Sequence, residues 1–156
     1  MPLLSCEFRM IPTSMKKNRL TGSFEFQFDL FGLVCNVKEY KLAWHLNQAL
    51  ELELSKQEDV KIEFSNQQAI SISSYKYENE HLTVELLQNR LVSYGAGSNK
   101  YLLPELSRFD YLLKVRDETG EVTSENVVGL IRGLFLVEYV VKLNFDELKS
   151  KENLLY

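Results

Sequence analysis

The sequence predicts an α+β fold, with a single mixed, mainly antiparallel sheet, two main helices on one face and a short C-terminal helix. Apolar and polar residues alternate in several short segments, and this period of two is typical of strands with one buried face. Two other segments carry apolar residues at helical spacing. Three strand patterns also follow one another without a helix between them, which favours antiparallel pairing.

Length and composition indicate one globular domain. The chain has 156 residues, of which 45% are apolar and 12% are aromatic, and this is enough for a packed core. Residues 1–14 differ from the rest because they contain two prolines and show no clean period. We therefore expect a weakly ordered N-terminal extension over residues 1–14 and a single α+β domain over residues 15–156.

The domain begins with a strand and a long helix. Apolar residues at alternate positions predict a strand that starts near Ser23: Phe24, Phe26, Phe28 and Leu30. Asn36 and, three residues later, Glu39 form a capping-box pattern. This pattern predicts a helix from Val37 to about Leu54.

The apolar stripe of this helix is wide, which is typical of a helix that lies across a sheet. Trp44 belongs to the stripe, so we expect its side chain to be largely buried. Tyr40 and Asn47 lie on the same helical face as Trp44. These three residues are also candidates for the floor of a ligand pocket or for part of an interface.

Five further strands are predicted, over residues 60–64, 70–77, 82–86, 109–116 and 135–143. A short polar connection separates the second from the third, so these two should form a hairpin. Ser124 can cap a helix over residues 126–134, and Asn144 with Glu147 begins a final helical turn. The last strand–helix–strand unit predicts one parallel crossover pair, as in split βαβ sheets.

The most distinctive motif is the segment Leu103-Pro104-Glu105-Leu106-Ser107-Arg108-Phe109-Asp110-Tyr111. It resembles the signature of the IPExxxVDY family of small bacterial proteins. Leu103 stands for the Ile of the signature and Phe109 for its Val, and four residues match it outright: Pro104, Glu105, Asp110 and Tyr111. The segment from Lys38 to Trp44 also resembles the first helix of that family, and the likeness covers roughly residues 15–156. The resemblance implies no particular activity.

The motif has a structural interpretation and a chemical one. Pro104 suits the first position of a helical turn, where its missing N–H costs nothing, and Glu105 complements the dipole of that turn. Asp110 would accept backbone N–H groups or pair with Lys114, while Phe109 and Tyr111 share one strand face. In the chemical interpretation, Glu105 and Asp110 form an acid/base pair whose pKa values are driven apart.

The sequence contains no other motif that is typical of a catalytic or metal-binding site. The two histidines, His45 and His81, are isolated, and the two cysteines, Cys6 and Cys35, lack a metal-type spacing, so we expect no metal site. Cys35 lies in an apolar stretch and should be buried. No phosphate-binding or nucleophile-elbow motif occurs, and no cofactor is expected.

Charge and hydropathy restrict the kinds of partner and the cellular location that we expect for this protein. The net charge of −4 argues against nucleic acid or an anionic membrane surface as the main partner. No apolar run approaches the ~18–20 residues of a membrane span. The first residues also lack the basic and apolar regions of a secretory signal, so we expect a cytoplasmic protein.

Three functions remain open. The leading hypothesis is a non-enzymatic protein–protein interaction module that works as a homodimer, because eight tyrosines and one tryptophan offer the anchors that interfaces prefer. The first alternative is a small-ligand-binding or acid/base catalytic domain that uses Glu105 and Asp110. The second, suggested by the family resemblance, is an accessory factor in RNA metabolism.

Overall fold

The computed structural model describes residues 28–63, 69–91 and 100–154 of the chain, without the side chains of residues 62–63, 69–70, 91, 100 and 151–152. The predicted extension over residues 1–14 lies outside the described residues, as do Phe24 and Phe26 of the first predicted strand.

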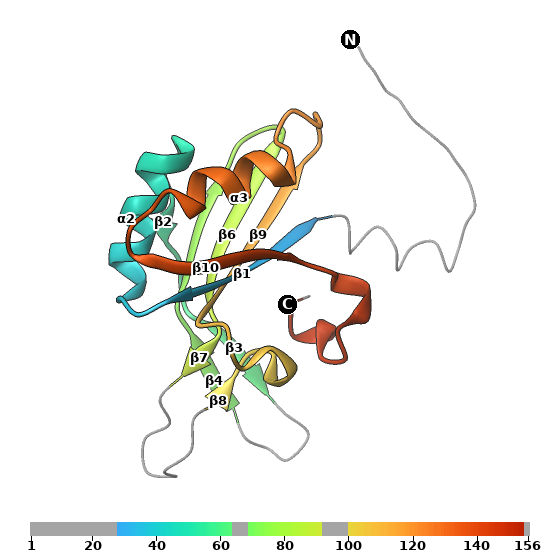
Figure 1. The fold of residues 1–156 in the computed structure, drawn as a ribbon. Coiled ribbons are helices and arrows are strands. Elements are labelled where there is room, and N and C mark those ends of the chain that lie inside the picture. The colour runs from blue at the N-terminus through green and yellow to red at the C-terminus, as the bar shows by residue number, and fades with distance from the viewer. Residues whose placement is uncertain (1–27, 64–68, 92–99, 155–156) are drawn as a thin grey trace, which may run out of the picture.

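Six strands form the main sheet, in the order β10-β1-β9-β6-β5-β2 (Figure 1). Their bounds are Asp29–Cys35 for β1, Ser55–Lys56 for β2, Ser74–Glu78 for β5, Leu82–Gln88 for β6, Tyr111–Asp117 for β9 and Val137–Leu143 for β10. Two short sheets lie beside it: β3 (Val60–Glu63) pairs with β4 (Ala69–Ile72), and β7 (Arg90–Leu91) pairs with β8 (Lys100–Tyr101). The predicted α+β class is confirmed.

The predicted parallel crossover pair is wrong in one respect. Strands β9 and β10 run in the same direction, but β1 lies between them and pairs with both in antiparallel fashion. All strand pairs of the described chain are therefore antiparallel. The physical reason is that β1 is apolar on both of its faces, with Leu30 and Phe31 almost fully buried, and such a strand belongs inside the sheet.

The predicted strand over residues 70–77 is two strands. β4 pairs with β3 in the small sheet, whereas β5 pairs with β6 in the main sheet. The change of sheet at Ser73 breaks the run, and the alternation changes phase there, from Ile70 and Ile72 to Tyr75 and Tyr77. The predicted hairpin between residues 70–77 and 82–86 is confirmed as β5–β6.

Both helices cover one face of the main sheet, as predicted (Figure 1). They are α2 (Glu39–Leu50) and α3 (Ser124–Arg132), and their buried residues pack on the sheet in one core: Leu42, Ala43, Leu46, Val127 and Ile131. Neither helix of the described chain has the length and apolarity that crossing a membrane requires.

The helix starts differ from the predictions. The N-cap of α2 is Lys38 and no side chain caps it, so the predicted capping box of Asn36 and Glu39 is wrong. The N-cap of α3 is Thr123, whose side chain accepts from the N–H of Asn126, while Ser124 donates to Asp29. The helix α2 also ends at Leu50, before the predicted Leu54, because the next residue turns into a left-handed conformation with φ of 55°.

The opposite face of the sheet has its own apolar core. It includes Leu30, Leu87 and Leu112 from the strands, together with Leu102 and Leu103. The C-terminal segment covers this core through two 3₁₀ turns, η3 (Phe145–Glu147) and η4 (Lys151–Leu154). The predicted final turn at Asn144 is confirmed as the start of η3, with the side chain of Asn144 accepting from the N–H of Asp146.

Candidate functional site

The motif segment, residues 103–111, folds around the buried side chain of Asn89. The Oδ1 atom of Asn89 accepts from the N–H of Leu103 at 2.8 Å. Its Nδ2 atom donates to the carbonyl groups of Leu106, at 2.9 Å, and Phe109, at 2.8 Å. Because Asn89 is fully buried, these bonds replace the water that the same groups bind in the unfolded chain. Asn89 therefore fixes the shape of the motif segment.

The ring of Phe109 lies against β1 at Gly32. A Cβ atom at Gly32 would come within 2.7 Å of this ring, so only glycine leaves room for it. The ring also stacks with that of Tyr139 at 6.4 Å, and Arg108 lies over it at 4.8 Å. The prediction that Phe109 and Tyr111 share one strand face is wrong, because Phe109 precedes β9 and its ring meets the sheet face opposite to the helices.

Pro104 and Glu105 begin the 3₁₀ turn η2 (Pro104–Leu106), as expected of a proline at the first position. The Oε2 atom of Glu105 accepts from the N–H groups of Lys149, at 2.6 Å, and Ser150, at 2.8 Å. Burial tends to raise the pKa of Glu105, but the N–H groups of Glu105 itself, Ser150 and Lys149 outweigh it and lower the pKa. Glu105 thus ties the C-terminal segment to the motif segment.

Asp110 joins the motif segment to β1. Its Oδ2 atom accepts from the N–H of Cys35 at 3.0 Å, and its Oδ1 atom lies 3.2 Å from Nη2 of Arg90. The expected acceptance of a backbone N–H is therefore observed. The alternative pairing with Lys114 is not formed, because Nζ of Lys114 lies 3.3 Å from Oε1 of Glu85 instead.

The two motif carboxylates bind different segments of the chain. Glu105 holds the C-terminal segment and Asp110 holds β1, and neither lines the two cavities described below.

Tyr111 completes the motif, because its buried hydroxyl donates to the carbonyl of Val37 just before α2. Burial raises the pKa of Tyr111, and the nearby Glu39 raises it further, so the hydroxyl keeps its proton. Every motif residue described here has a structural contact.

Exposed aromatic residues gather on the helix side of the molecule. The structure leaves Trp44 58% exposed and Tyr40 63% exposed, so the prediction that Trp44 is buried is wrong. Phe135, between α3 and β10, is 84% exposed. The ring of His45 lies edge-to-face with Trp44 at 5.0 Å and with Phe135 at 5.6 Å. We refer to Tyr40, Trp44, His45 and Phe135 as the aromatic cluster.

Helix geometry explains the exposure of Trp44. The residues of α2 that meet the sheet are Leu42, Ala43 and Leu46, and Trp44 lies about 160° around the helix from Leu42 and Leu46. Asn47, the third residue of the predicted face, has a structural contact, since its Oδ1 atom accepts from the N–H of Leu54 at 2.8 Å. Of the predicted set, Tyr40 and Trp44 remain available on the surface.

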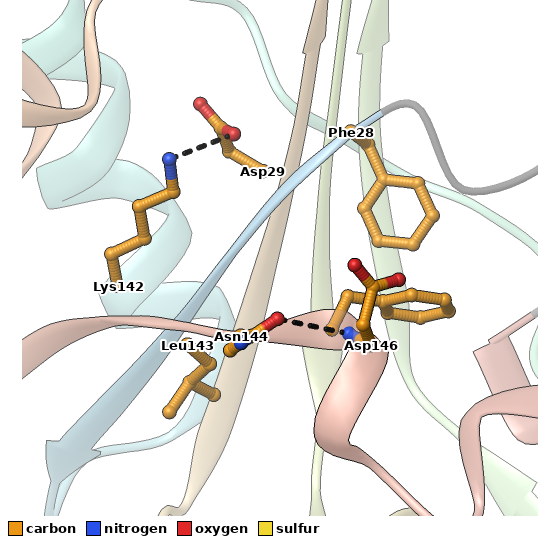
Figure 2. Close-up of a pocket in the computed structure, with 7 residues that line it drawn as sticks. Phe28, Asp29, Lys142, Leu143, Asn144 and Asp146 are labelled. Atoms are coloured by element: carbon orange, nitrogen blue, oxygen red, sulfur yellow. Dashed lines mark hydrogen bonds and ion pairs between the residues drawn. The ribbon is translucent and has the colours of Figure 1, made fainter. Parts of the chain in front are cut away.

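An open cavity of about 410 Å³ lies where β1 begins and β10 ends (Figure 2). Two of its charged residues, Asp29 and Lys142, form an ion pair. Oδ1 of Asp29 lies 3.2 Å from Nζ of Lys142, and Oδ2 of Asp29 accepts from the hydroxyl of Ser124 at 3.1 Å.

A second cavity of about 200 Å³, between the helices and the sheet, is lined mainly by aliphatic side chains such as Leu50 and Val127. No group of three or more potential metal ligands occurs among the described residues.

Sequence reasoning missed Asn89 and Phe135. A single asparagine after a strand pattern carries no signal of burial, because asparagine is equally common in loops. Phe135 was assigned to a strand, where an apolar residue implies core. The β10 strand begins only at Val137, so Phe135 stays outside the sheet. Cys35 was correctly expected to be buried; burial raises its pKa to about 11, so it remains a thiol.

Comparisons with known proteins add no identification. No protein-family model matches the chain, no curated protein matches it, and no solved structure matches it. The resemblance to the IPExxxVDY family therefore stays a prediction from the motif.

Proposed function

We propose that this chain is a cytoplasmic protein–protein interaction module whose contact surface is the aromatic cluster. One observation carries the proposal: the side chains of Trp44 and Phe135, from separate elements, are both more than half exposed and are joined through the ring of His45. Homodimer formation is part of the proposal.

The chemistry of the cluster supports this function. Aromatic residues are enriched in interfaces, and tryptophan and tyrosine are over-represented among the residues that dominate binding free energy. The edge-to-face contacts of His45 restrict the rotamers of its neighbours before binding. Less conformational entropy is then lost when a partner covers them.

The acid/base alternative has less support. General acid–base catalysis needs two carboxylates that face one substrate, whereas Glu105 and Asp110 each accept backbone N–H groups from a different segment. For an accessory role in RNA metabolism, no observation on the described residues adds to the family resemblance.

The fluorescence of Trp44, the only tryptophan of the chain, tests the proposal directly. In dilute protein its emission should resemble that of tryptophan in water, and it should shift to shorter wavelength when a partner covers the cluster. Partners are identified by cross-linking and mass spectrometry in the native cells, with the wild-type chain and Phe135→Ser compared.

Leu130→Ser is the matched control, because Leu130 is 50% exposed but lies outside the aromatic cluster. We expect Phe135→Ser to lose the cross-linked partners and Leu130→Ser to keep them. If all three chains recover the same partners, the aromatic cluster is not the contact surface.

A further inference from the structure

One margin of the main sheet is long and open on the described chain. β10 has seven residues and is the outermost strand, whereas the opposite margin is the two-residue strand β2 (Figure 1). An edge strand presents unpaired N–H and C=O groups, and another strand can add to it. Tyr139 on this edge is 50% exposed, so the edge offers apolar surface as well as hydrogen bonds.

We propose that β10 pairs with β10 of a second copy of this chain, in antiparallel orientation, about a two-fold axis at Val140. The inference rests on the proposed function as an interaction module and specifies the partner. The two main sheets would then continue into one another, and each copy would present the same surface to the other, as a two-fold dimer requires.

The register follows from the residues on either side of Val140. Around this axis, Glu138 lies opposite Lys142 of the second copy, and this opposite-charge pair occurs twice. Tyr139 lies opposite Val141, an aromatic and β-branched pair of the kind that stabilises antiparallel strands. Both pairs make β10 complementary to itself.

The neighbouring axis at Val141 fits less well. It would place Lys142 opposite Val140, which is buried in the core beneath the helices. A charge opposite a buried aliphatic side chain gains no partner. A two-fold axis perpendicular to the sheet must pass through a residue position if both copies keep their helices on the same face. The axis at Tyr139, on the other side of Val140, would place Glu138 opposite the same buried Val140 and fits no better.

The surroundings of β10 are compatible with this pairing. The ion pair of Lys142 with Asp29 is exposed, and such pairs contribute little, so Lys142 can also face a second carboxylate. The ladder with β1 shifts register between Val34 and Cys35, opposite Glu138, so the regular part of the edge runs from Tyr139 to Leu143. Glu138 is the extra residue at this shift and lies just before the regular part, from where its side chain can reach Lys142 of the second copy.

Strand pairing alone buries less than the ~1,200 Å² that stable complexes need, so the flanking side chains must contribute. Phe135 lies two residues before β10 and belongs to the aromatic cluster, while Tyr139 stacks on Phe109 on the other sheet face. The edge is thus bordered by aromatic rings on both sides.

Exchange of the two charges tests the register. Light scattering and sedimentation equilibrium give the dimer dissociation constant of the wild-type chain, of Glu138→Lys and of Lys142→Glu. Each single change places like charges opposite one another twice, and we expect the dissociation constant to rise about tenfold or more. The double variant, and an equimolar mixture of the two single variants, should regain the wild-type affinity.

Control variants make the same changes of net charge elsewhere: Glu80→Lys in the β5–β6 turn and Lys61→Glu on β3, both at exposed positions. They should leave the dissociation constant unchanged. Amide hydrogen exchange gives a readout without any variant. The N–H groups of β10 that point away from β1, at alternate positions among residues 139–143, should become more protected as the protein concentration rises.

The outcomes separate this inference from the proposed function. A chain that stays monomeric up to high concentration, with exchange of β10 independent of concentration, overturns the dimer. Failure of the mixture to regain affinity overturns the register at Val140. Either result leaves the cross-linking test of Phe135→Ser unaffected, so the aromatic cluster can still bind a different protein. A dimer that obeys the charge exchange while Phe135→Ser keeps all heterologous partners supports the inference and contradicts the aromatic surface.

Discussion

The ring of Phe109 occupies the space that a side chain at Gly32 would fill, since an added Cβ atom would lie 2.7 Å from the ring. A residue of the motif segment and a residue in the middle of β1 are thereby fixed against each other across 77 positions of sequence. This contact explains why a glycine, a poor strand former, is placed in the centre of a sheet.

Gly32→Ala should therefore destabilise the protein by ~1–3 kcal/mol, the usual cost of overpacking a core. Phe109→Leu in the same chain should recover part of this loss, because a smaller side chain leaves room for the new methyl group. Gly129→Ala in α3 is the control: its Cβ would meet nothing within 4 Å, and alanine favours the helix, so stability should stay equal or rise. Urea unfolding measures all three. Equal effects of the two alanine changes would contradict the contact.

Asn89→Ala should lower stability by ~3 kcal/mol, because it leaves one buried N–H and two carbonyl groups of the motif segment without their partner. Asn89→Asp should also be costly, since a carboxylate cannot donate to Leu106 and Phe109. Asn79→Ala, in the exposed β5–β6 turn, is the comparison and should cost less. Thermal unfolding followed by circular dichroism decides between these expectations.

Asp110→Asn should destabilise more than Glu105→Gln. Asp110 accepts from Cys35 and pairs with Arg90 near the start of β9, and a charge-assisted bond of this kind contributes ~1.5–3 kcal/mol. Glu105 is exposed, so its two bonds compete with water, and its loss should cost under ~1 kcal/mol. Denaturation midpoints of the two variants give the order directly. A larger loss for Glu105→Gln would mean that the contact of Glu105 with the C-terminal segment contributes more to stability than the contacts of Asp110.

Acid should weaken the attachment at Glu105. Its folded-state pKa lies below the ordinary value of 4.5, so the unfolded chain takes up this proton first as the pH falls. The stability that Glu105 contributes is complete above its unfolded-state pKa and is lost as the pH falls through the folded-state pKa. Glu105→Gln should consequently lose less stability than the wild-type chain between neutral and acid pH. Parallel pH profiles for the two chains would show that the carboxylate is not held as described.

Trp44→Ala should change stability by less than ~1 kcal/mol, because the side chain is mostly exposed. Phe31→Ala, at a fully buried position of β1, should cost ~3–5 kcal/mol in the same measurement. A loss of several kcal/mol for Trp44→Ala would contradict the exposed position of this side chain and would indicate that it is buried, as the sequence pattern predicted.

The sequence by itself determined the class of fold and most of its elements. The alternation of apolar residues predicted the β5–β6 hairpin, and the helical spacing predicted α2 and α3 on one face of a sheet. Pro104 marked the start of the η2 turn, and Asp110 was correctly expected to bind a backbone N–H. These are local features, since each depends on the period of a segment or on the geometry of one residue.

The tertiary structure decided what depends on contacts between distant segments. Two apolar stripes run along α2, one through Leu42 and Leu46 and one through Tyr40 and Trp44, and only the position of the sheet selects the first for burial. The insertion of β1 between β9 and β10 likewise depends on competition among strands for the central positions. The hydrogen bonds of Asn89 and the partners of Glu105 join segments that no periodicity relates. For these, the energy of the folded state rather than the local pattern determines the structure.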